Sequence, residues 1–66
     1  MEVTVIYGKI KEKKEIQENS TIKEVLNLMD ISSETVVVKR NNEIVMDEEH
    51  LKNEDVIEVI RVIYGG

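Results

Sequence analysis

Chemistry at the end of the chain is indicated by two adjacent glycines, Gly65 and Gly66, which directly follow the segment VIEVIRVIY. A glycine pair has no Cβ atoms, so its backbone can thread a narrow channel and approach a phosphate closely. The carboxylate of Gly66 would then be the reactive group, delivered to a site on another protein. Two glycines alone are a weak motif, because a frayed terminus shows the same residues.

The residues before the glycines support a functional tail. In the preceding strand Ile57 and Val59 share one face, and a continued strand would place Arg61 on that face too. An unpaired arginine in the core is costly. We therefore expect the chain to leave the sheet near residue 60 or 61, with 61–66 as an extended tail. Exposed tails are usually polar, whereas this one offers a partner's groove three apolar residues: Val62, Ile63 and Tyr64.

The first half of the chain predicts a hairpin followed by a helix. Residues 2–7 alternate between apolar and polar side chains, and 10–17 form a second strand at an edge, where lysines discourage edge-to-edge pairing. Apolar residues then recur with the helical period over 22–29. Thr21, followed by Glu24 at capping-box spacing, is the expected N-cap, with Ser20 as the alternative.

The second half predicts another hairpin and a last strand. Asn41 and Asn42 form a plausible two-residue turn, which places Arg40 opposite Glu43. A loop containing Leu51 then leads to a strand at 56–60. A single helix can bury its apolar stripe against only one face of a sheet. The expected fold is therefore an α+β roll, a mixed sheet of four to five strands packed on one helix, in one domain spanning 1–66.

The strand periodicity assigns the apolar residues to two faces. The face toward the helix, with the helix stripe and the loop leucine, gives this predicted core: Val3, Val5, Ile16, Ile22, Val25, Leu26, Met29, Val36, Val38, Val45, Leu51, Ile57 and Val59. The opposite face is unusually apolar for a surface with no helix, and such patches often mark partner sites. We expect partner contacts there from Ile6, Val37, Ile44 and Ile60, near Met46; scattered surface residues or a dimer contact are the alternatives.

Composition excludes several classes of function. The 66 residues contain no Cys and one His, His50, so we expect neither a disulfide nor a metal site. The net charge of -5 argues against nucleic acid and anionic membranes. No apolar run approaches the roughly 18 residues of a membrane span, and a cytoplasmic protein is expected. Without a glycine-rich phosphate loop or a catalytic cluster, the chain would bind no cofactor and would not be an enzyme.

These features together resemble a known family. The element order, the helix TIKEVLNL, the late Leu51 and the glycine pair are similar to the ubiquitin-like β-grasp proteins, and more closely to the small prokaryotic sulfur carriers of the thiamin and molybdopterin pathways and the small archaeal modifiers. The hairpin VVVKRNNEIV and the ending LKNEDVIEVIRVIYGG match patterns of these carriers.

The chain departs from those patterns at two positions. The family's loop glycine is Glu54 here, so that Asn53 would have to supply a positive φ through a shifted turn, or the loop would differ. Tyr64 is bulkier than the small residue often found before the glycines, which leaves open which activating enzyme accepts the tail.

The resemblance implies a function for the tail. In such proteins a ubiquitin-activating-type adenylyltransferase uses Mg-ATP to adenylate the terminal carboxylate, here that of Gly66. Sulfur donor and acceptor enzymes would then make and use a thiocarboxylate, for thiamin, tRNA thiolation or molybdopterin. One alternative is a modifier that joins Gly66 to lysines of target proteins. Another, of a different class, is a β-grasp interaction domain with an inert tail.

Overall fold

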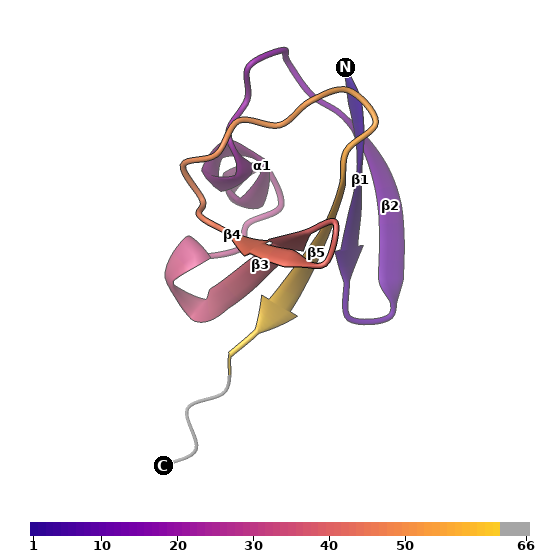
Figure 1. Cartoon of the computed structure of the whole chain (residues 1–66). Helices are drawn as coiled ribbons and strands as arrows, with labels where there is room; N and C mark the ends of the chain where they lie inside the picture. The colour runs from indigo at the N-terminus through magenta and orange to yellow at the C-terminus, as the bar shows by residue number, and fades with distance from the viewer. Residues whose placement is uncertain (63–66) are drawn as a thin grey trace.

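A five-stranded mixed sheet forms one layer of the molecule, and a single helix packs on one of its faces (Figure 1). The computed structural model describes residues 1–62. The strand order is β2-β1-β5-β3-β4, with β1 parallel to β5 and the other neighbours antiparallel. This arrangement confirms the predicted α+β roll. The strands are β1 (Glu2–Tyr7), β2 (Ile10–Glu15), β3 (Val36–Arg40), β4 (Glu43–Val45) and β5 (Val56–Arg61).

The helix α1 (Ile22–Leu28) begins at the predicted N-cap. The Thr21 hydroxyl accepts a hydrogen bond from the Glu24 backbone N–H, and the Glu24 carboxylate accepts one from the Thr21 N–H, both at 3.2 Å. This reciprocal capping box satisfies two backbone donors that the first helical turn leaves unpaired. Met29, expected inside the helix, is its C-cap, and a short 3-10 helix η1 (Ser33–Thr35) then leads into β3.

Both hairpins have the turns that their sequences favour. Gly8 has a φ of 63° between β1 and β2. Asn41 and Asn42 have φ values of 54° and 68°, as a two-residue turn with matching twist requires. The predicted pairing of Arg40 with Glu43 is confirmed. The strand β2 ends at Glu15, two positions before the predicted end at residue 17.

The core lies between α1 and the sheet and is entirely aliphatic. All of its fully buried hydrophobic residues belong to the set predicted from the sequence: Val3, Val5, Ile16, Ile22, Val25, Leu26, Val38, Leu51, Ile57 and Val59. The other three predicted members, Met29, Val36 and Val45, are partly buried against this cluster. The helical period, the strand alternation and the apolar loop residue Leu51 therefore identify the core correctly.

The loop between β4 and β5 is attached to the sheet through Arg40. The guanidinium donates to the His50 backbone carbonyl at 3.0 Å and to the Glu49 carboxylate at 3.1 Å, and it lies 3.6 Å from the Asp55 carboxylate. These contacts hold the loop in place while Leu51, only 3% exposed, fills the core beneath it.

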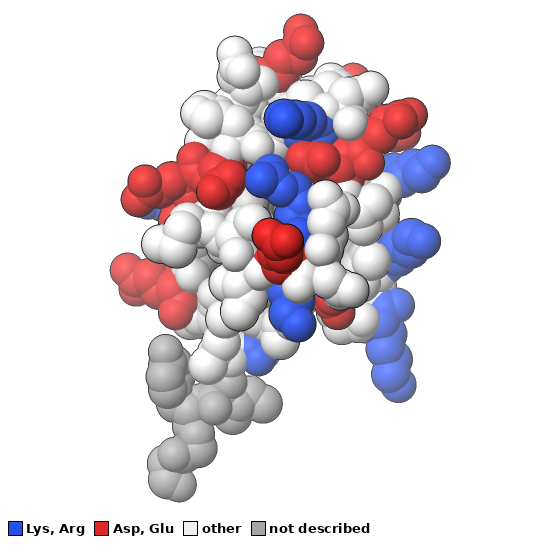
Figure 2. All heavy atoms as spheres, in the orientation of Figure 1, with Lys and Arg blue, Asp and Glu red and all other residues white. Residues whose placement is uncertain are grey.

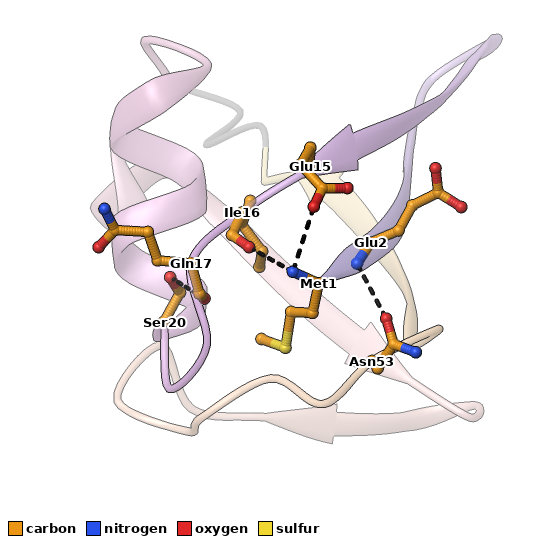
Figure 3. A network of polar contacts seen from close by, with 7 residues as sticks. All are labelled: Met1, Glu2, Glu15, Ile16, Gln17, Ser20 and Asn53. Atoms are coloured by element: carbon orange, nitrogen blue, oxygen red, sulfur yellow. Dashed lines mark hydrogen bonds and ion pairs between the residues drawn. The ribbon is translucent and has the colours of Figure 1, made fainter.

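The start of β1 is fixed to the same loop and to the segment after β2 (Figure 3). The amino group of Met1 donates to the Ile16 carbonyl at 2.7 Å, and the Asn53 side-chain oxygen accepts from the Glu2 N–H at 2.9 Å. Glu54, and not Asn53, has the positive φ, at 69°. Glu54 thus has the positive φ at the position where the family pattern has glycine, while the Asn53 side chain binds β1.

This conformation predicts that Glu54→Gly stabilises the protein. A non-glycine residue in the left-handed region costs about 1–2 kcal/mol, part of which the greater unfolded-state freedom of glycine offsets. We expect a net gain of about 0.5–1 kcal/mol, which thermal denaturation would record as a rise of about 3–6 °C in Tm. The exposed Glu48 has no positive φ, so Glu48→Gly is the matched control and should lower Tm. Equal losses in both variants would contradict this account.

Candidate functional site

The end of β5 lies one residue before the last described position of the chain. In Figure 1 this strand ends on the side of the molecule away from the N-terminus. Arg61 pairs with Val36 as the last residue of β5, and the Val62 N–H donates to the Thr35 carbonyl at 3.0 Å. Arg61, expected to begin the tail, thus remains in the sheet. Its side chain is exposed at the end of the strand, so the desolvation cost that we invoked does not arise.

The residues predicted to react lie beyond this point. Ile63, Tyr64, Gly65 and Gly66 are outside the described residues, and the roles assigned to them stay predictions. Val62 is half-buried at the last described position. The structure therefore defines where β5 ends and which surface lies beside that end.

That surface includes the outer face of the sheet, meaning the face opposite α1. Closest to the end of β5, Val37 and Ile60 lie directly opposite each other on β3 and β5. Ile60 is 37% exposed and Val37 is half-buried. The pair forms an apolar row beside the end of β5. Two of the predicted partner residues are thus brought together.

The next row across the outer face mixes charged and apolar residues. Glu58 lies between Ile6 on β1 and Lys39 on β3, and Lys39 in turn lies opposite Ile44 on β4. Ile6 and Ile44 are therefore separated by two charged residues and do not form one continuous patch. Ile44 is nevertheless 67% exposed.

Other outer-face residues were not singled out in the sequence. Val56 is 45% exposed and, with Ile6, Lys39 and Glu58, lines a shallow hollow beside the β3–β4 turn. The alternation of β5 places Val56 on the same face as Glu58 and Ile60, so the sequence could have identified Val56 as an outer-face residue. The position of Lys39 beside Glu58 could not be identified in this way, because it depends on which strands are neighbours.

The described residues place apolar side chains on the outer face of the sheet and gather no set of metal-binding side chains. Among residues 1–62, no group of three or more His, Cys, Asp or Glu side chains could hold a metal ion. His50 instead contacts the Asn19 carbonyl through Nδ1 at 2.8 Å. Within the same range, no helix is long and apolar enough to cross a membrane. The arrangement leaves an apolar row on the outer face next to the end of β5.

Comparison with known proteins identifies the family. The model of the ThiS family matches residues 3–66, which is nearly the whole chain. The chain belongs to the ThiS family. A relative in Thermus thermophilus, the sulfur carrier protein TtuB, is 36% identical over 52 residues, which cover 79% of this chain and 80% of that protein. The resemblance to ubiquitin-like sulfur carriers is thereby confirmed.

Solved structures agree with the fold of this ThiS-family chain. The thiamine biosynthesis protein ThiS from Geobacter metallireducens superposes with a TM-score of 0.66 at 20% identity, covering 96% of this chain and 99% of that one. The ubiquitin of Caldiarchaeum subterraneum gives a TM-score of 0.71 at 17% identity, covering 100% and 98%. At these identities the similarity establishes the β-grasp fold alone.

Proposed function

We propose that this protein is a sulfur carrier whose Gly66 carboxylate is adenylated by a partner enzyme and converted to a thiocarboxylate. The observation that carries the proposal is that the ThiS-family match runs through Gly66, while the central strand β5 ends at Arg61. The glycine pair thus lies past the end of the sheet in sequence. Similarity to the sulfur carrier protein TtuB supports the same conclusion.

The proposed chemistry takes place in three steps at the terminal carboxyl group. First, a carboxylate oxygen attacks the α-phosphorus of ATP, pyrophosphate leaves, and an acyl-adenylate forms. Next, a persulfide sulfur of a donor protein attacks the acyl carbon and displaces AMP. A thiol then attacks the other sulfur of the resulting acyl persulfide, so that the donor leaves in a disulfide and the carrier keeps one sulfur as its thiocarboxylate.

This scheme assigns the catalytic work to the partners. The chain has three glycines, Gly8, Gly65 and Gly66, and thus no glycine-rich loop to hold phosphates. Mg-ATP, the charges that stabilise the phosphoryl group, and the sulfur nucleophile would come from the activating and donor enzymes. The carrier supplies the carboxylate and a docking surface, and the enzyme that takes the thiocarboxylate decides whether thiamin, tRNA or molybdopterin receives the sulfur.

The outer face is the proposed docking surface for the activating enzyme. The row of Val37 and Ile60 lies where β5 ends, so a partner bound there would be next to the start of the tail. Apolar anchors at the centre of an interface commonly contribute most of its binding energy. In this proposal, Val62, Ile63 and Tyr64 extend the same contact toward the nucleotide pocket, with Ile6 and Ile44 at its sides.

Intact-mass spectrometry of the protein isolated from its native cells tests the sulfur step. Replacing one carboxylate oxygen by sulfur adds about 16 Da, and a fraction of the protein should show this gain. A variant lacking Gly65 and Gly66 is the control and should never gain it. A different result, in which Gly66 is found joined to lysines of other proteins and the gain is absent, would identify a modifier and contradict the carrier proposal.

Ile60→Asp tests the docking surface. Ile60 is partly exposed and outside the core cluster, so the variant should keep its fold by circular dichroism. Loss of an apolar anchor should raise the KM of the activating enzyme for the carrier by about tenfold or more. Val56→Asp, on the same face at the other end of β5, is the matched control and should have a smaller effect. Unchanged activation kinetics in the folded Ile60→Asp variant would exclude this surface.

A further inference from the structure

The charges of this acidic protein are unevenly distributed. Its net charge is -5, yet the β1–β2 turn and β2 contain four lysines within six positions, Lys9 to Lys14. Figure 2 shows a row of basic side chains along the edge of the molecule that β2 forms in Figure 1, while acidic ones are spread over the left side, the top and the centre of this view. One margin of the sheet is therefore basic although the molecule as a whole is acidic.

Three of these lysines share the outer face or the turn, and we call them the basic margin: Lys9, Lys11 and Lys13. Lys11 lies opposite Ile6, and Lys13 lies opposite Thr4, so both project on the side away from α1. All three are exposed, and none forms an ion pair within 4.0 Å among the described residues. Their charges are thus available to a binding partner.

Lys14 provides a contrast on the same strand. It lies opposite the core residue Val3, on the side facing α1, and its ammonium pairs with the Glu12 carboxylate at 3.2 Å. Lysines on an edge strand also prevent aggregation. Preventing aggregation does not require the lysines without an ion pair to lie on the same face of the sheet. Here the lysines of β2 without an ion pair are the ones on the proposed docking face.

The basic margin is also close to the start of the tail. Tyr7 lies opposite Val59 in the parallel β1–β5 pair, so the turn containing Lys9 is at the same end of the sheet as Arg61. Lys11 belongs to the row of Ile6 and Glu58, directly next to the row that contains Ile60. The apolar row and the basic margin therefore form one continuous surface, with an apolar centre and a charged rim as in many protein interfaces.

We propose that the basic margin is the rim by which the carrier is oriented on its activating enzyme, and that the enzyme presents an acidic strip to it. This inference rests on the proposed function. An acidic strip would attract the margin and repel the carboxylates on the helix side, such as Glu24 and Glu34. Collisions in which the carrier turns its outer face and the end of β5 toward the enzyme would thus be favoured. Rim charges of this kind act mainly on association rate and partner choice.

The experiment compares two double variants with the same change in net charge. Lys11→Glu with Lys13→Glu reverses the margin, whereas Lys23→Glu with Lys52→Glu reverses exposed lysines on α1 and in the β4–β5 loop. Association of the full chain with the purified adenylyltransferase of the same organism is followed by stopped flow. We expect the margin variant to associate about tenfold more slowly at low salt, and the control within about twofold of wild type.

Two further measurements, association at high salt and activation at saturating carrier, complete the test. At 0.5 M NaCl the difference should close, because screening shortens the reach of these charges. Equal slowing of both double variants, or no slowing of either, overturns the proposal. A third result also overturns it: the wild-type chain and the control variant bind total tRNA, the margin variant does not, and the margin variant associates with the enzyme at the wild-type rate. Activation at saturating carrier, measured in the same samples, tests the proposed function separately, since steering should leave kcat unaltered.

Discussion

The central position of β5 is the constraint on which the rest of the structure depends. This strand pairs with β1 on one side and β3 on the other, so its backbone is fixed along both edges. Its inward residues Ile57 and Val59 are 0% and 2% exposed, while Ile60 points to the opposite face. One strand therefore links the core to the outer face and determines where the C-terminal residues begin. In the proposed function, this fixed position of β5 would hold the docking surface and the start of the C-terminal residues in one arrangement.

The stability of this arrangement comes from a small aliphatic core and from a few well-placed polar contacts. The protein has no cysteine, and a domain of this size buries only about 60% of its unfolded surface. The capping box of Thr21 sets the start of the helix, and Arg40 secures the long loop above Leu51. None of these contacts involves Val37 or Ile60, the apolar row of the proposed docking surface.

Much of this fold could be predicted because its signals are local. Alternation and helical period, with the single large apolar residue of the late loop, identified every buried hydrophobic residue, and the pair Asn41 and Asn42 predicted a turn with positive φ. The positive φ of Glu54 escaped prediction because the side chain of the neighbouring Asn53 is engaged by a strand far away in sequence. Arg61 was predicted to lie outside the sheet but is the last residue of β5. Alternation assigned it to the face of Ile57 and Val59, but could not show that this face is exposed at the end of the strand. The neighbours of Glu58 depend on a parallel crossover, which no local pattern encodes.

The most direct test of the central claim is ATP–pyrophosphate exchange catalysed by the adenylyltransferase of the same organism. Exchange reports reversible formation of an acyl-adenylate and needs no knowledge of the sulfur donor. The full chain should support exchange, and a folded chain lacking Gly65 and Gly66 should support none. Equal exchange with both chains, or none with either while the enzyme is active on another carrier, would contradict the assignment of Gly66 as the activated group.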